Sequence, residues 1–404
     1  MRAGTPFAAA RDRAVVGLTE RDRRLAHELS AGVLRARAEL DRALELDRAD
    51  PRLHDILRLG AYQLRRLARV PAHAAVSTSV DLARETAGLK AARYVNQALR
   101  RVARESGPDG VPAGEGGTHP GWLVERWRRR YGARGATSLV AWNDTRPPLT
   151  LQPGRWDRAT LESRLTEAGI AVSSAPFNAG LRIASTQVPA LPGYEAGAFL
   201  VQDPAQALVV RFAGVPTGAG LYDACAAPGG KAVRLAREGA HVVAGEARRE
   251  RLDRLRDTVH RQGVAVPLVA ADLLAAPFRP GVWDAVLVDA PCTATGTMAR
   301  HPDARWRLTP EAIGRLARRQ ATLLDAAAAL VRPGGLLVYA TCSLEPEENE
   351  AQVEAFLHRH PEFGRRPPPD RVPPVLVTAA GDFQSLPQRD GIDGAFAARL
   401  ARSA

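Results

Sequence analysis

The feature that most constrains the fold is a regular alternation of strand-like and helix-like segments over residues 195–404. Short apolar runs, typical of buried strands, are separated by longer segments in which apolar residues recur every three or four positions, as in amphipathic helices. Such alternation predicts a mostly parallel sheet with helices on both faces, an α/β domain whose ligands bind beyond the carboxyl ends of the strands. The expected strands are residues 220–224, 241–245, 266–271, 283–288 and 336–340, and the expected helices are residues 231–238, 248–262, 311–330 and one that begins near 347.

Residues 1–105 carry a different pattern, which indicates a small all-helical domain. Leu25, Leu29 and Val33 recur at intervals of four, so we expect them on the core face of one helix. Pro51 falls between two such stripes, where proline opens or separates helices. The further stripes are Leu53, Leu57, Ala61 and Leu64, and then Val95, Leu99 and Val102.

Between these domains lie a Gly/Pro-rich linker, residues 106–121, and a third region, residues 122–194. The third region begins with a basic segment that contains Trp122 and Trp127 among four arginines. Aromatic rings beside arginines suit single-stranded RNA through stacking and phosphate contacts. Two tryptophans on one helix fit docking against a neighbouring element equally well. Residues 136–190 are expected to form a small α/β module, with strands at 147–151 and 181–184 and a helix at 159–168.

Charge and cysteine content limit the class of partner and the compartment. Lysine and arginine number 56 against 44 acidic residues, and residues 1–130 hold 25 of the basic and 16 of the acidic side chains. A basic surface favours a polyanionic partner, although a solvated helical surface would also be basic. Three cysteines argue against a disulfide framework, and no apolar run resembles a signal peptide or a membrane span. We expect a cytoplasmic monomer that binds RNA and not membranes.

A glycine turn follows the first expected strand of the α/β domain and could hold a ligand. It reads Asp223, Cys225, Ala226, Ala227, Pro228, Gly229, Gly230 and Lys231, with Ala224 after the aspartate. Two adjacent glycines permit a tight turn and a close backbone approach, and the helix after them offers free N–H groups. The turn is not a P-loop, because the spacing between glycines and the terminal Gly-Lys-Ser/Thr are missing.

Two acids stand at the next two strand ends. Glu246 can bind both hydroxyls of a ribose, and Asp272 can accept a hydrogen bond from an adenine amino group. Each acid alone is more often a helix N-cap. With the glycine turn, they favour a ligand that contains adenosine.

Two cysteines also follow neighbouring strands: Cys292 in Asp289-Ala-Pro-Cys292, and Cys342 in Thr341-Cys-Ser343. No Cys-x-x-Cys or His-rich spacing supports a metal site. Cytosine methylation accounts for the set, because a thiolate that adds to carbon 6 turns carbon 5 into a nucleophile for a sulfonium methyl group. A carboxyl group near ring nitrogen 3 can stabilise this adduct. The residues alone leave open which cysteine attacks.

These motifs resemble the RsmB-type (Sun/Fmu) ribosomal RNA cytosine-5 methyltransferases of bacteria. Residues 223–231, the two cysteine motifs, Gly296–Trp306 and Glu345–Asn349 all match that family's pattern. The N-terminal segments at residues 58–62, 70–75 and 94–96 resemble its NusB-like RNA-binding domain. The resemblance implies a Rossmann-like catalytic domain that uses S-adenosylmethionine.

The resemblance also implies a role for each residue. Cys342 would be the nucleophile, Cys292 would assist release of the adduct, and Asp289 would touch both the cytosine and the reactive end of the cofactor. Residues 225–231, Glu246 and Asp272 would line the cofactor. A lowered thiol pKa would aid attack at neutral pH, and Arg305 is one candidate for the group that lowers it.

The chain departs from the family pattern at three places: Leu151-Gln-Pro-Gly-Arg155 replaces Leu-Arg-Val-Asn, Ala395 stands in the usual Asp-Gly-Phe-Phe, and Pro204-Ala205 follows Gln202-Asp203. Other functions remain open. The chain could be a transfer-RNA cytosine-5 methyltransferase or a non-catalytic RNA-binding assembly or antitermination factor. A thiol oxidoreductase would need a Cys-x-x-Cys motif, which the chain lacks.

Overall fold

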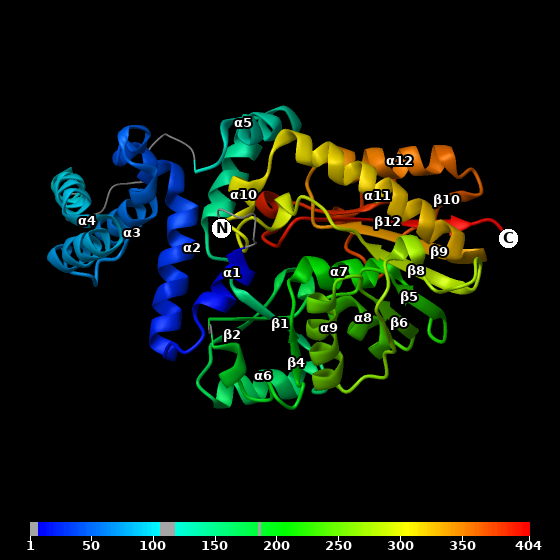
Figure 1. Cartoon of the computed structure of the whole chain (residues 1–404). Coiled ribbons are helices and arrows are strands. Elements are labelled where there is room, and N and C mark those ends of the chain that lie inside the picture. The colour runs from blue at the N-terminus through cyan, green and yellow to red at the C-terminus, as the bar shows by residue number, and fades with distance from the viewer. Residues whose placement is uncertain (1–6, 106–117, 185–186) are drawn as a thin grey trace. The chain divides into compact units, whose positions relative to one another are not determined.

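The computed structural model describes residues 7–105, 118–184 and 187–404 (Figure 1). Contacts divide the chain into two units. The first comprises the chain up to Thr145 together with Met298–Arg307, and the second comprises Arg146–Thr297 and Leu308–Ala404. The finer division at 1–105, 122–194 and 195–404 stays a prediction, and most of the expected linker (106–117) lies outside the described residues.

The first unit is helical, as the apolar stripes predict. Thr19 begins its longest uninterrupted helix by accepting a hydrogen bond from the Asp22 N–H, as N-cap threonines do. Two helices bend at glycines with positive φ, Gly88 at 85° and Gly132 at 72°. The helices are α1 (Phe7–Ala14), α2 (Glu20–Ala43), α3 (His54–Arg66), α4 (Ala72–Glu105), α5 (Gly121–Asp144) and α10 (Ala304–Arg307).

Most of the predicted stripes form the core of this unit. Leu57, Leu99 and Val102 are fully buried in one cluster. Leu25 is the exception, because 47% of it is exposed. The expectation that Leu25 lies on a core face is wrong, since it sits one turn nearer the helix N-terminus than Leu29, which does pack against the cluster.

Helix α5 carries the basic, aromatic segment. Trp127 is fully buried, and its ring lies edge-on against His119 with the ring centroids 5.5 Å apart. The docking alternative is therefore confirmed for Trp127, which is not available to stack on RNA in this structure. Arg128 and Arg129 are exposed and lie within 4.0 Å of the Glu125 carboxylate.

The second unit contains two sheets. The smaller is antiparallel in the order β2-β3-β1-β4, from Val172–Ser174, Leu181–Ile183, Leu149–Pro153 and Phe199–Val201. Helix α6 (Arg158–Glu167) joins β1 to β2, and Asp157 caps it by accepting from the Thr160 N–H. The module expected within residues 136–190 thus forms, but its first nine residues belong to α5.

The larger sheet runs in the order β10-β12-β9-β8-β5-β6-β7, with β11 paired to β12. The neighbouring strands β9, β8, β5, β6 and β7 are parallel, as predicted. Strands β10, β11 and β12 form an antiparallel edge that the sequence did not indicate. The strands are β5 (Gly220–Asp223), β6 (His241–Gly245), β7 (Leu268–Val269), β8 (Trp283–Asp289), β9 (Val331–Thr341), β10 (Phe363–Arg365), β11 (Phe383–Ser385) and β12 (Ala395–Arg402).

Helices cover both faces of this sheet (Figure 1). One face packs against α7 (Pro204–Ala213), α8 (Gly230–Arg237) and α9 (Arg249–Gln262), and the other against α11 (Pro310–Leu330) and α12 (Glu350–Arg359). A short helix, α13 (Pro387–Asp390), precedes β12.

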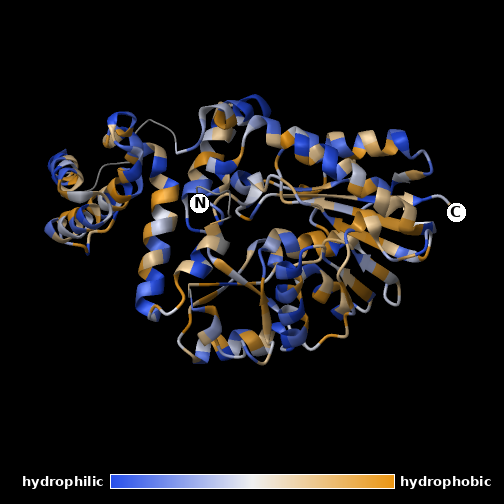
Figure 2. Cartoon of the chain, in the orientation of Figure 1, coloured by the Kyte–Doolittle hydropathy of each residue, from blue (hydrophilic) through white to orange (hydrophobic). Residues whose placement is uncertain are grey.

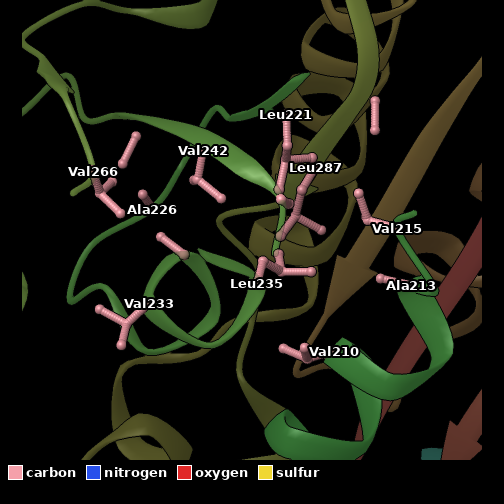
Figure 3. Close-up of a cluster of buried hydrophobic side chains, with 14 of the residues drawn as sticks. Val210, Ala213, Val215, Leu221, Ala226, Val233, Leu235, Val242, Val266 and Leu287 are labelled. Carbon is pink, nitrogen blue, oxygen red and sulfur yellow. The ribbon is translucent and has the colours of Figure 1, made fainter. Parts of the chain in front are cut away.

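Alternate residues of each central strand face the two cores. Leu221 and Leu287 pack with α8 and α9 in one cluster (Figure 3), whereas Tyr222 and Val286 pack on the α11 side. Apolar colour accordingly gathers on the strands and inner helix faces (Figure 2). In the described ranges, no helix has the length and apolar character that crossing a bilayer requires.

Candidate active site

The predicted site residues lie at one edge of the larger sheet, because they leave the carboxyl ends of parallel strands. Asp223 ends β5, and Asp289 ends β8, the strand beside it. Cys342 directly follows β9, which pairs with β8 on its other side. Glu246 follows β6, the neighbour of β5. The open α/β architecture places ligands at this edge.

The turn after β5 has little room for side chains. Gly229 has a φ of +107°, and a Cβ atom there would lie 2.8 Å from Leu255. A Cβ at Gly230 would lie 2.9 Å from the Gln202 amide nitrogen. Glycine at position 229 is therefore favoured by backbone conformation, and a side chain at either position would have to displace Leu255 or Gln202.

A buried acid lies at the start of this turn. Asp223 is fully buried, and neither carboxylate oxygen has a hydrogen-bond partner in the described part of the chain. Burial, and then the charge of Asp289, raise the pKa of Asp223 to about 7. Unpaired buried acceptors are costly, so a ligand that donates hydrogen bonds or carries positive charge fits this position. The amino group of S-adenosylmethionine has that chemistry.

Cys225 differs from the other two cysteines. Burial raises the pKa of its thiol to about 12. It therefore stays protonated at neutral pH, which suits a lining residue of the turn and not a nucleophile.

The two acids expected to bind adenosine are held differently. Glu246 is buried; its Oε1 accepts from the Arg248 N–H at 2.9 Å, and its Oε2 lies 3.4 Å from the Arg251 Nε. Asp272 is exposed and accepts from the Leu274 N–H at 3.1 Å. The helix-cap alternative is thus confirmed for Asp272, and its contact with a cofactor stays a prediction.

Asp289 is fixed by Lys231, the last residue of the turn. The Lys231 Nζ lies 2.7 Å from Asp289 Oδ2 and also donates to the Gln206 side chain. Lys231 is 7% exposed, so its charge is held inside the site. The side chain of Lys231 therefore orients the Asp289 carboxylate, a contact that the sequence did not indicate.

The two cysteines at the strand ends meet. Their sulfur atoms are 3.3 Å apart, close enough for a hydrogen bond between thiol and sulfur. The hydrogen bond to Cys342, together with burial, raises the pKa of Cys292 well above its ordinary value. The contact with Cys342 and burial therefore favour the protonated form of Cys292.

Glu348 holds the residues that follow both cysteines. Its carboxylate accepts from the backbone N–H and the hydroxyl of Thr293, the residue after Cys292. It also accepts from the hydroxyl of Ser343, the residue after Cys342, and from the Gln320 amide at 2.9 Å. Despite these donors, burial raises the pKa of Glu348. Sequence reasoning noticed its motif, Glu345–Asn349, but gave it no role.

Arg305, the candidate for lowering a thiol pKa, is engaged elsewhere. It belongs to the first unit, where it is fully buried. Its guanidinium donates to Asp144 at 2.8 Å and to the Asn143 carbonyl at 2.7 Å. The described contacts of Arg305 therefore do not support a role for it in lowering the pKa of a cysteine thiol.

Gln152, at the first departure from the family pattern, is also structural. It is 1% exposed, donates to the Ala179 carbonyl and accepts from Arg234 at 3.2 Å. No group of three or more His, Cys, Asp or Glu side chains suited to a metal occurs among the residues that the structure describes.

Three family models match the chain: "16S rRNA methyltransferase RsmB/F" over residues 216–401, the NusB family over 8–104, and an RsmF/B-like ferredoxin-like domain over 119–189. A probable ribosomal RNA small subunit methyltransferase B from Synechocystis is 36% identical over 96% of this chain and 92% of its own. The ribosomal RNA small subunit methyltransferase B of Yersinia pseudotuberculosis is 33% identical over 95% and 92%.

Solved structures share the fold. The crystal structure of the protein PH0851 superposes with a TM-score of 0.81 at 24% identity, over 96% of this chain and 92% of that one. NSun6 from Pyrococcus horikoshii gives 0.61 at 19% identity, over 70% of this chain and 98% of that one.

Proposed function

The chain belongs to the RsmB/F family of 16S rRNA methyltransferases, and from this premise we propose that it methylates carbon 5 of a cytosine in small-subunit ribosomal RNA. The observation that carries the proposal is the pair of cysteine sulfurs 3.3 Å apart beside the Lys231–Asp289 pair. Methylation at a ring nitrogen or a ribose oxygen would need no thiol. Methylation at an unactivated carbon does.

The donor is S-adenosylmethionine, which supplies an electrophilic methyl group on a sulfonium. The residues that would hold it are those of the Asp223–Lys231 turn, with Glu246 on the ribose. The Asp223 carboxylate fits this role, since both of its oxygens can accept hydrogen bonds from a ligand. Gly229 permits the positive φ that the turn requires.

Cys342 acts on the cytosine. Its thiolate forms a bond to carbon 6, and the displaced ring electrons make carbon 5 nucleophilic. Asp289, oriented by Lys231, stabilises the adduct at ring nitrogen 3. After carbon 5 has taken the methyl group, it must lose its proton, and the bond between sulfur and carbon 6 then breaks.

Cys292 accepts that proton as a thiolate, after its own thiol proton has passed to water. While both thiols are free, its hydrogen bond to Cys342 is the largest cause of its raised pKa. Once the Cys342 sulfur is bonded to carbon 6, this hydrogen bond is lost and Cys292 ionises more readily. The geometry thus supports a base that becomes active only after the adduct exists.

Two cysteine variants test the mechanism. Cys342→Ala should form no covalent complex and transfer no methyl group. Cys292→Ala should still attack and methylate, but should accumulate as a protein–RNA species that survives denaturing gel electrophoresis. The reverse pattern would assign attack to Cys292, and two active variants without trapping would exclude a covalent mechanism.

The substrate needs a separate test. Bisulfite sequencing of ribosomal RNA from a deletion strain should lose a 5-methylcytosine in the small-subunit RNA. Loss of the mark from transfer RNA instead would favour the alternative substrate. A protein with no cofactor binding in calorimetry would be a non-catalytic RNA-binding factor.

A further inference from the structure

The second unit contains a basic cavity that the mechanism does not use. It has a volume of about 290 Å³ and lies where α7 and α8 meet the small sheet. Four of the side chains that line it are arginines, Arg158, Arg211, Arg234 and Arg237, and one is acidic, Glu238. We refer to it as the arginine pocket.

The charges of the arginine pocket do not balance. Glu238 lies 3.8 Å from Arg234 and 3.2 Å from Arg371, so one carboxylate serves two guanidinium groups. Burial lowers the pKa of Arg211 and of Arg234. The Glu238 charge opposes this shift, while Arg371 and a neighbouring arginine of the pocket add to it. Such mutual repulsion weakens when an anion occupies the space between the cations.

The arginines are held in place by backbone groups. Arg211 donates to the carbonyls of Phe177 and Asn178, and Arg158 donates to the carbonyl of Gly180. Guanidinium groups fixed in this way lose little freedom when a ligand binds. Their planar donors match the oxygens of a phosphate.

One donor at the pocket has no partner. The Arg234 Nε is buried without a hydrogen bond in the described residues, although the other end of its guanidinium donates to Gln152 at 3.2 Å. A buried unpaired N–H is costly, so this side chain has capacity for an acceptor.

The pocket lies along the same helix as the catalytic edge. Lys231, which contacts Asp289, is in the first turn of α8, and Arg234 and Arg237 follow one and two turns later. The helical rise separates their Cα atoms from that of Lys231 by roughly 4.5 and 9 Å along the axis. The pocket therefore begins within roughly two helical turns of the residue that contacts Asp289.

We propose that the arginine pocket binds a backbone phosphate of the substrate RNA a short distance from the methylated base. The identity of the ligand as RNA rests on the proposed function. The shared chemistry is a phosphate group, so the test separates RNA from a free phosphate compound.

The experiment measures RNA affinity across a series of salt concentrations. Replacing Arg234 and Arg237 together by Gln should weaken binding by roughly tenfold at low salt. The slope of log affinity against log salt should become shallower by about 0.7–0.9. Binding releases fewer counterions when one phosphate contact has been lost. If the double variant folds poorly, Arg237→Gln can be measured alone, because Arg237 is exposed.

Matched variants separate charge from structure. The double Arg→Lys variant should keep the slope, and so should Arg319→Gln, an exposed charge on α11 at the opposite face of the sheet. Inorganic phosphate should compete with RNA for the pocket. It should therefore reduce the RNA affinity of the wild type more than it reduces the RNA affinity of the double Gln variant.

An unchanged slope in the double Gln variant would overturn the proposal, even if inorganic phosphate stabilised the wild type against unfolding. That last result would indicate a site for a free phosphate compound. Methyl transfer by the wild type to the same RNA is measured separately. Its absence would contradict the proposed function, while the slopes, which need only binding, would still decide the pocket.

Discussion

Glu348 is the side chain whose importance is hardest to see from the sequence. An acidic residue between other acidic residues ordinarily indicates a solvated surface. Here four donors from three segments converge on one buried carboxylate. Only the tertiary structure brings Thr293 and Ser343 together, 50 residues apart in the chain. The sequence could therefore predict both cysteines but not the residue that holds their loops.

Glu348→Gln should slow methyl transfer without weakening cofactor binding. The amide oxygen can still accept from the Thr293 N–H and the Gln320 amide, which share one oxygen of Glu348. Its N–H₂ group, however, then stands opposite the Thr293 and Ser343 hydroxyls, which donate to the other oxygen in the native structure. A buried unsatisfied group costs about 1–3 kcal/mol, enough to shift the two cysteine loops. Steady-state kinetics with a calorimetric cofactor titration would check this, and Glu347→Gln is the control. Equal rates for the two variants would contradict the positioning role.

Asp223 gives a prediction for pH dependence. Its pKa of about 7 in the folded protein lies above the ordinary 3.8, so the native state holds the proton more tightly. The contribution of Asp223 to stability should therefore fall as pH rises from about 4 to 7 and then level off. Asp223→Asn has no carboxyl at this position and therefore lacks this pH-dependent loss of stability. Without ligand, the variant should be roughly 2–4 kcal/mol more stable than the wild type at pH 8 and no more stable at pH 4.

Thermal unfolding across this pH range would measure the difference. Excess S-adenosylmethionine should reverse the order at pH 8, because the wild type gains a ligand that the variant binds weakly. If the difference in stability between the wild type and Asp223→Asn does not change with pH, ionisation of the buried Asp223 carboxyl does not destabilise the folded protein.

At the level of elements, periodicity predicted the parts of the sheet that are buried on both faces. Strands β5, β6 and β8 lie within one residue of their predicted ends, because continuous apolar runs are typical of such strands. Strand β7 has only two residues where six were expected, and Pro267 directly before it lacks an N–H to donate. Strand β12 was missed because half of its residues are alanine, a helix former, and pairing with β9 decides its state.

The end of β6 carries the prediction for the cofactor. Glu246→Ala should weaken S-adenosylmethionine binding by roughly tenfold to a hundredfold, because a charge-assisted pair of hydrogen bonds contributes about 1.5–3 kcal/mol. Calorimetric titration would measure it. Asp272→Ala is the comparison, since its exposed carboxylate already caps the next turn. Wild-type affinity in Glu246→Ala would show that the ribose assignment is wrong.

At the level of the whole molecule, the two units do not follow the order of the chain. Met298–Arg307 lies within the sequence of the catalytic domain but packs in the first unit. Asp303 accepts from the Phe7 N–H at 3.0 Å, and the Trp306 indole donates to the Leu34 carbonyl at 2.7 Å. These contacts join positions nearly 300 residues apart, so no local pattern reveals them.

Deleting residues 1–105 should therefore have three separate effects. Cofactor affinity should survive, because the turn at Asp223–Lys231 and its neighbours lie in the second unit. RNA binding should weaken and its salt dependence should flatten, because the deletion removes the basic side chains that we expect to contact phosphates. Methyl transfer should fall further than binding does, since residues 298–307, a few positions after Cys292, lose the contacts with Phe7 and Leu34.

Trp306→Phe separates the loss of methyl transfer from the loss of RNA binding. It removes the hydrogen bond to Leu34 but keeps every basic residue of the helical unit. The salt slope of this variant should equal that of the wild type, while its rate of methyl transfer at saturating RNA should fall. If the deletion leaves the salt slope unchanged, the helical unit contributes no phosphate contacts. If Trp306→Phe transfers methyl groups at the wild-type rate, the contacts of residues 298–307 stabilise the fold without supporting the cysteine loop, and the loss of activity on deletion must come from RNA binding alone.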